Sequence, residues 1–317
     1  MRYIKNITII FVILSSLIRN SSAQNPNDLY KLSLEQTIKG NYSEALTSID
    51  KSLLSDSTKI DFLIQKATVF YHLNRYDEAL RNCYTILKTQ PENPQVFILR
   101  GLISLSTKSY GGAIFLFGKA IKLTTDKDNL YKAYLNRGKV YMATDKYTEA
   151  ISDFNAAGSF KPDSMEVLMA LSDAYYKIKQ PVQALEKALK IIELHPMYAN
   201  AYKMIGYIYY DKKETEKALE WLTKFCELNP NDASAFQLIS TIQLENKNLD
   251  KAQLAIGLAT RLNSSDPYNF KILATIYIAK GQKEEACNSL FHAFKLGYIE
   301  KYGYDLLNLY LSNCESR

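Results

Sequence analysis

Histidine and cysteine are the side chains best suited to nucleophilic catalysis and metal binding, and this 317-residue chain has three histidines and four cysteines. No two of His72, His195 and His292 have the spacing of metal ligands, and no Cys-x-x-Cys occurs. Cys287 and His292 are five residues apart. That spacing is about 140° around a helix, so a helix would point the two side chains away from each other. The sequence therefore predicts no metal site and no cysteine–histidine catalytic pair.

Other catalytic signatures are missing as well. The chain has no Gly-x-Ser-x-Gly, no phosphate-binding loop and no His-Glu-x-x-His. Acidic pairs, such as Asp77 with Glu78 and Glu284 with Glu285, recur where helices are expected to begin, and there they complement the helix dipole. We therefore expect a protein that is not an enzyme and that uses no cofactor.

The first 23 residues predict export. Arg2 and Lys5 precede an apolar run, residues 7–18, and the small residues 21–23 end at Ala23, which is the pattern of a cleaved secretory signal peptide. The run is shorter than the ~20 residues that span a bilayer, and an uncleaved anchor is the alternative interpretation. We expect a periplasmic protein, or one that is outer-membrane associated or secreted, with no membrane-spanning segment after cleavage.

The charge of the chain argues against a nucleic-acid partner. The formal net charge is +6, and it falls to +3 after cleavage because Arg2, Lys5 and Arg19 are lost and no acid is lost. Nucleic-acid binding needs clustered lysine and arginine, and the remaining chain has no such cluster. The expected partner is a protein or peptide.

The elements that would position a binding site repeat along the chain. An alanine returns every 34 residues, except for a step of 37 between Ala113 and Ala150. A fixed period indicates stacked units that bury their apolar faces against their neighbours. The alanine column is Ala45, Ala79, Ala113, Ala150, Ala184, Ala218, Ala252 and Ala286.

Each period contains two helices. A small residue stands twelve positions before each alanine, where two helices cross closely, and a large apolar residue stands four positions further back. Apolar residues four and seven positions after the alanine belong to a second helix, and a polar turn such as residues 39–41 separates the two. The small column is Ser33, Ala67, Gly101, Gly138, Ser172, Gly206, Ser240 and Ala274.

This hairpin resembles the tetratricopeptide repeat. The unit nearest to the family pattern carries Tyr134, Gly138, Tyr141, Ala150, Phe154, Ala157 and Pro162. The resemblance covers about residues 26–300 and implies an all-α, right-handed superhelical solenoid of about eight helical hairpins. The expected units are 26–59, 60–93, 94–127, 131–164, 165–198, 199–232, 233–266 and 267–300, followed by a capping helix and tail at 301–317.

Two features depart from a uniform array. Three extra residues fall between the third and fourth units, around residues 123–130, and predict a longer loop that acts as a hinge. The four cysteines would lie in an oxidising compartment. Cys83 and Cys226 fall on or beside core columns and are expected to be buried thiols. Cys287 and Cys314 would meet if the capping helix folds back, and the sequence leaves a disulfide between them open.

The first helices of such repeats line a concave face, where residues outside the packing columns are free to bind. These positions are largely apolar or aromatic in the third to sixth units, which favours a partner site there. The alternative is that they pack between neighbouring first helices. The candidate partner-binding residues are Ile98, Leu102, Leu105, Leu135, Lys139, Met142, Met169, Tyr176, Lys203, Tyr207 and Tyr210.

One groove type of the family grips a terminal carboxylate with Lys, Asn and Arg, and the resemblance does not extend to it. The matching places hold Tyr30, Leu34, Ile64, Thr68, Ile98 and Leu102. Two functions stay open: an exported scaffold or adaptor that binds a partner protein, and an envelope component that handles glycan or cell-wall material. Tyr207 and Tyr210 would serve the second by stacking on sugar rings, whereas the aliphatic residues favour a peptide.

Overall fold

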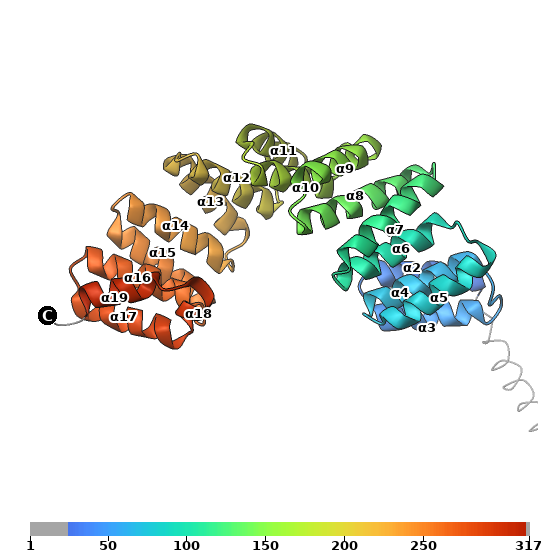
Figure 1. Cartoon of the computed structure of the whole chain (residues 1–317), viewed down its shortest axis with the longest axis horizontal. Coiled ribbons are helices and arrows are strands. Elements are labelled where there is room, and N and C mark those ends of the chain that lie inside the picture. The colour runs from blue at the N-terminus through green and yellow to red at the C-terminus, as the bar shows by residue number, and fades with distance from the viewer. Residues whose placement is uncertain (1–24, 315–317) are drawn as a thin grey trace, which may run out of the picture. The chain divides into compact units, whose positions relative to one another are not determined.

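A computed structural model of the chain describes residues 25–314, so the predicted signal peptide lies outside the described residues. About 80% of the described part is helical and none of it forms a strand. The helices follow one another as tandem hairpins, each first helix packing against the second helix that follows it (Figure 1). The predicted all-α solenoid of helical hairpins is confirmed. Its right-handed superhelical course stays a prediction.

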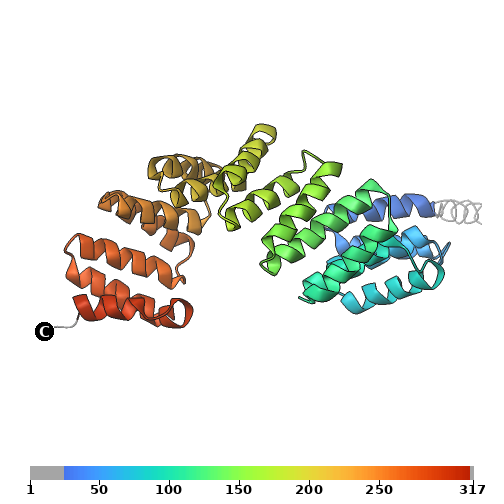
Figure 2. The ribbon, with the colours of Figure 1, turned by 45° about the horizontal axis from the view of Figure 1, so that its top comes forward.

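The chain divides between Lys161 and Pro162 into two compact halves. Within each half, consecutive hairpins lie side by side in chain order (Figure 2). The N-terminal half holds α2 (Pro26–Ile38), α3 (Tyr42–Leu53), α4 (Ile60–His72), α5 (Tyr76–Thr89), α6 (Pro94–Ser106), α7 (Tyr110–Leu123), α8 (Lys127–Ala143) and α9 (Tyr147–Phe160). The C-terminal half holds α10 (Met165–Lys177), α11 (Pro181–Leu194), α12 (Ala199–Asp211), α13 (Thr215–Leu228), α14 (Ala233–Glu245), α15 (Leu249–Leu262), α16 (Pro267–Ala279), α17 (Lys283–Lys295), α18 (Tyr298–Tyr302) and α19 (Asp305–Asn313).

A residue with positive φ makes the turn inside every hairpin. After α4, Asn74 has φ 58°, its N–H donates to Tyr71 O, and the N–H of Arg75 donates to Phe70 O. This pair of bonds is the Schellman motif, which satisfies the last carbonyls of a helix. The residues in this conformation are Gly40, Asn74, Lys108, Asp145, Lys179, Lys213, Lys247 and Gly281. Glycine occupies only the first and last of these turns. The turns are therefore identified by their place in the 34-residue repeat and not by a glycine.

The small column brings the two helices of each hairpin together in two ways. At Gly138 an added Cβ would lie 2.5 Å from Cε1 of Phe154, so only hydrogen fits beside that ring. Where serine stands instead, its hydroxyl donates to a carbonyl of the facing helix, as Ser172 Oγ does to Ala184 O at 2.8 Å. The glycines and serines of the small column are buried, and both kinds of contact fix how the two helices of a hairpin cross.

The expectation of a longer loop between the third and fourth repeats is wrong. Only residues 124–126 separate α7 from α8, and the extra residues instead lengthen α8, which has 17 residues where most first helices have 13. Asp126 caps the added turn, because its side chain accepts a hydrogen bond from the N–H of Asn129 at 2.8 Å. The insertion therefore adds about one turn of helix at the start of the fourth repeat.

Two short helices close the C-terminal half. Tyr298 from α18 and Leu306 from α19 are buried against Leu290 and Ala293 of the last repeat. A disulfide joins Cys287 on α17 to Cys314, just after α19. The free thiols are Cys83 and Cys226, and burial raises the pKa of Cys83 to about 12 and that of Cys226 to about 11.

Candidate functional site

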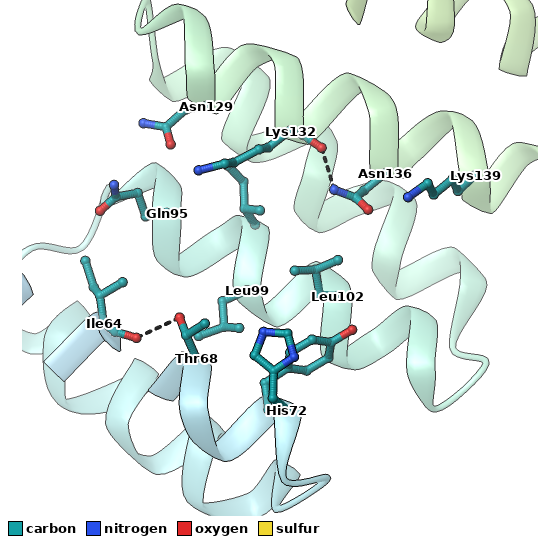
Figure 3. Close-up of a pocket in the computed structure, with 12 residues that line it drawn as sticks. Ile64, Thr68, His72, Gln95, Leu99, Leu102, Asn129, Lys132, Asn136 and Lys139 are labelled. Atoms are coloured by element: carbon teal, nitrogen blue, oxygen red, sulfur yellow. Dashed lines mark hydrogen bonds between the residues drawn. The ribbon is translucent and has the colours of Figure 1, made fainter. Parts of the chain in front are cut away.

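Three first helices of the N-terminal half, α4, α6 and α8, line a groove of about 480 Å³ (Figure 3). Its floor is aliphatic, and amide and ammonium groups stand around it. No carboxylate lines it. The lining residues are Ile64, Thr68, Tyr71 and His72 from α4; Gln95, Ile98, Leu99 and Leu102 from α6; and Asn129, Lys132, Asn136 and Lys139 from α8.

The polar side of the groove is one face of α8. Asn129, Lys132, Asn136 and Lys139 are spaced by three, four and three residues, which aligns them on one stripe of a helix. Asn129 belongs to the turn that the insertion adds, so the lengthened helix supplies this polar group.

Asn129 is the most enclosed of these polar residues, with 9% of its surface exposed. In the part of the chain that the structure describes, its side-chain amide makes no hydrogen bond, and neither does that of the exposed Gln95. The two amides stand at the same end of the groove in Figure 3. Asn136 donates its amide N–H to Lys132 O at 2.7 Å, which leaves its carbonyl oxygen to accept. The groove therefore offers both donors and acceptors beside an apolar floor.

An aromatic stack borders the other end of the groove. His72 stacks on Tyr42 with ring centroids 4.9 Å apart, and Tyr71 meets His72 edge-on at 5.2 Å. Partial burial lowers the pKa of His72, so the imidazole is neutral at neutral pH. It contributes a hydrogen-bonding group to the groove and no charge at that pH.

The structure separates the residues of the predicted stripe. Leu135 is buried, with 3% of its surface exposed, so it is not the free surface residue that the sequence predicts. Ile98 is also buried, with 6% of its surface exposed, but it lines the floor of the groove. Leu102 and Lys139 line the groove. Leu105 is half-buried against the core of the third repeat. Met142 is half-buried without lining the groove. The remaining members, Met169, Tyr176, Lys203, Tyr207 and Tyr210, belong to the C-terminal half and are half-buried there.

In the C-terminal half, most polar members of the stripe bond to the next repeat. Lys203 Nζ lies 2.8 Å from Asp232 Oδ2 and 2.7 Å from Ser234 Oγ. Gln237, one repeat later, donates to Asp266 Oδ2 at 2.8 Å. These aspartates are the N-caps of the following first helices, so the ladder ties successive repeats together.

Two tyrosines of the stripe also serve this contact between repeats. Tyr210 donates its hydroxyl to Glu245 Oε1 at 2.7 Å. Burial, followed by this hydrogen bond, raises the pKa of Tyr210 to about 12. Burial and the Asp211 carboxylate raise the pKa of Tyr176 in the same way. The groove of the N-terminal half, with amides that have no bond, is therefore the better candidate site.

Sequence reasoning missed Gln95, Asn129 and Asn136. The available signal was the alternation of asparagine and lysine at helical spacing directly after the three extra residues. The three extra residues predict a longer loop, whereas the segment that carries Asn129 continues the helix α8.

Comparison with known proteins agrees with this architecture. Residues 131–164 and 199–232 match the model of the tetratricopeptide repeat. The chain contains tetratricopeptide repeats. A Hsp70-Hsp90 organizing protein of Triticum aestivum is 25% identical over 204 residues, which is 54% of this chain and 35% of that protein. The chain spans about a third of the length of the curated relatives it matches.

Solved structures share the fold at low identity. The crystal structure of the APC/C hetero-tetramer Cut9-Hcn1 matches with a TM-score of 0.61 and 16% identity over 85% of this chain and 52% of that chain. A tetratricopeptide repeat protein from Parabacteroides merdae matches with a TM-score of 0.54 and 16% identity, over 80% of this chain and 99% of that one. Tetratricopeptide repeat proteins are protein-interaction scaffolds.

Two searches of the described residues complete the description. No helix among residues 25–314 is both long and apolar enough to cross a membrane. The same residues contain no group of three or more His, Cys, Asp and Glu side chains that could hold a metal ion.

Proposed function

We propose that this protein is an exported scaffold that binds an extended segment of a partner protein in the groove of α4, α6 and α8. The observation that carries the proposal is the side chain of Asn129, which lines the groove beside the aliphatic floor and makes no hydrogen bond in the described part of the chain. An amide beside an apolar floor offers both a donor and an acceptor, and it matches the N–H and C=O groups of an extended chain whose side chains lie on that floor.

The floor of the groove favours a polypeptide over a glycan. Ile64, Ile98, Leu99 and Leu102 match aliphatic side chains, whereas a sugar ring prefers a flat aromatic face. Tyr71 and His72 are the aromatic residues that line the groove, and they stack on each other and on Tyr42.

Export is supported by the N-terminal pattern and by the disulfide. A bond between Cys287 and Cys314 is stable in an oxidising compartment and rare in the cytosol. We place the protein in the periplasm, or outside the cell. Mass spectrometry of the mature protein tests this, with Gln24 as the expected first residue; a chain that still begins at Met1 would contradict cleavage.

A pair of charge insertions tests the binding site. Leu102→Glu places a carboxylate in the groove and should reduce recovery of the partner from the native envelope fraction at least tenfold, with the melting temperature measured in parallel. Phe115→Glu is the matched control, because Phe115 is 69% exposed on the second helix α7 and does not line the groove. Equal loss in both folded variants, or unchanged recovery with Leu102→Glu, would exclude the groove.

A further inference from the structure

Arg100 on α6 is a half-buried cation that the groove does not use. Its Nε is buried and has no hydrogen-bond partner, and no other described residue forms an ion pair or hydrogen bond with the guanidinium. Native proteins pair nearly all buried polar atoms, and a buried charge without a partner is costly. The ring of Tyr84, whose centroid is 5.1 Å from the guanidinium carbon, holds the group by a cation–π contact.

The fourth repeat shows what complements an arginine at this position. Arg137 precedes Gly138 as Arg100 precedes Gly101, and it donates Nε–H to Asp153 Oδ2 at 2.7 Å and Nη2–H to Oδ1 at 2.8 Å. The side chain of Asp153 is only 6% exposed. Asp153 stands three residues after the column alanine.

The third repeat has Leu116 at the position of Asp153. Arg100 therefore has the setting of Arg137 without the carboxylate. The third and fourth repeats of the same chain thus differ in whether this arginine has a carboxylate partner.

A second pocket, of about 470 Å³, opens at Arg100. Its lining includes Leu116 and the hydroxyl residues Ser104, Thr107 and Ser109. Ser109 is the exposed N-cap of α7, and its side chain makes no capping bond, so its hydroxyl is open to a ligand in the pocket.

This second pocket is separate from the groove. Arg100 and Ser104 lie on the side of α6 roughly opposite to Ile98 and Leu102, and Thr107 follows the end of that helix. The rest of the lining of this second pocket consists of Asn74, Tyr76, Asp77, Leu80, Tyr84 and Ile103. Asp77 is the one carboxylate in the lining, and it forms no ion pair with Arg100 within the described part of the chain.

We propose that this pocket receives a carboxylate from an acidic side chain of the partner protein, which pairs with Arg100 as Asp153 pairs with Arg137 in the fourth repeat. The planar guanidinium would meet it with two parallel N–H bonds, and the hydroxyls of Ser104 and Ser109 would donate to its remaining lone pairs. The hydroxyl of Thr107 already donates to Ile103 O at 3.0 Å and to Ser104 O at 3.2 Å. Only the source of the carboxylate rests on the proposed function; the pocket itself does not.

Acetate tests the pocket without any partner. The Nε–Hε NMR signals of the arginines are followed during titration of the oxidised, full-length mature protein with acetate, at ionic strength held constant with chloride. The Arg100 signal should shift saturably, whereas that of Arg137, already paired, should stay in place. A shift of Arg100 that is linear and equal to that of the exposed Arg81 would overturn the pocket. Saturation by inorganic phosphate at a tenfold lower concentration than acetate would overturn the carboxylate assignment.

Leu116→Asp supplies the missing carboxylate from within the chain. It should move the Arg100 signal to a position like that of Arg137 and abolish the acetate response, whereas the uncharged Leu116→Asn should not move it. An acetate response that survives Leu116→Asp would contradict the geometry.

Arg100→Gln then tests the partner as the source of the carboxylate. Recovery of the partner in the envelope assay should fall at least fivefold. If the unaltered protein binds acetate but Arg100→Gln recovers as much partner as before, the partner is not the source of the carboxylate. That result leaves the groove of α4, α6 and α8 untouched, because Leu102→Glu tests it separately.

Discussion

Gly138→Ala tests the close crossing of α8 and α9. The added Cβ would lie 2.5 Å from Cε1 and 2.7 Å from Cδ1 of Phe154, whose side chain is fully buried and has no open space to enter. Overpacking a core costs about 1–3 kcal/mol, and the better helix propensity of alanine offsets about 1 kcal/mol. We expect the free energy of unfolding to fall by up to about 2 kcal/mol, measured by urea denaturation.

The eighth repeat supplies the rescue for this change. It carries Ala274 and Leu290 at the positions of Gly138 and Phe154. Adding Phe154→Leu to Gly138→Ala should therefore recover stability relative to the sum of the two single losses, with a favourable coupling of about 1 kcal/mol.

Gly257→Ala is the control for helix propensity, because a Cβ there meets no atom within 4 Å. It should stabilise the protein by up to about 1 kcal/mol. Additive losses in the Gly138 and Phe154 pair, or equal losses at Gly138 and Gly257, would refute the close-crossing argument.

Four further changes probe other contacts. Tyr210→Phe removes the bond to Glu245 and should cost about 1 kcal/mol in unfolding free energy, whereas Tyr207→Phe, which loses no hydrogen bond of the described part, should cost less than half of that; equal costs would argue against the ladder between repeats. Reducing the Cys287–Cys314 bond, whose partners are 27 residues apart, should destabilise by about 3.5 kcal/mol in the chain-entropy model, and thiol titration of the denatured, unreduced protein should find two free thiols, not four. Lys213→Gly, at φ 64°, should stabilise by about 0.5 kcal/mol in urea denaturation, and a loss would contradict the turn geometry. Burial acts to raise the pKa of Asp232, but hydrogen bonds from Lys203 and Ser234 lower it overall, so the stability that Asp232 contributes is present above its ordinary pKa and is lost as pH falls through the folded value. The stability difference between Lys203→Met and the unaltered protein should therefore shrink as the pH is lowered below the ordinary pKa of aspartate, and a difference that stays constant would reject the linkage.

The sequence determines the hairpins because an alanine column and a small-residue column act locally and repeat. The turns were harder to recognise in detail, since lysine occupies the left-handed position in four of them. Periodicity also cannot show whether an inserted segment continues a helix, and Asn129 was missed for that reason.

The hydrogen bonds between side chains of neighbouring repeats cannot be predicted from the sequence, for a different reason. Lys203 and Tyr210 look free on their own helices, and only the placement of the next repeat shows their partners Asp232 and Glu245. Arg100 is the converse case, because its lack of a carboxylate becomes visible only when the third and fourth repeats are compared in three dimensions.

An extended partner segment that lies across α4, α6 and α8 should be captured by site-specific photo-crosslinking in the native cell. A photoreactive residue replaces Thr68 on α4 in one strain, Asn136 on α8 in a second and the exposed Phe115 in a third, and crosslinked peptides are mapped by mass spectrometry. The account predicts that Thr68 and Asn136 capture one contiguous segment of the same protein, and that Phe115 does not. Equal capture from Phe115, or crosslinks from Thr68 and Asn136 to glycan alone, would contradict it.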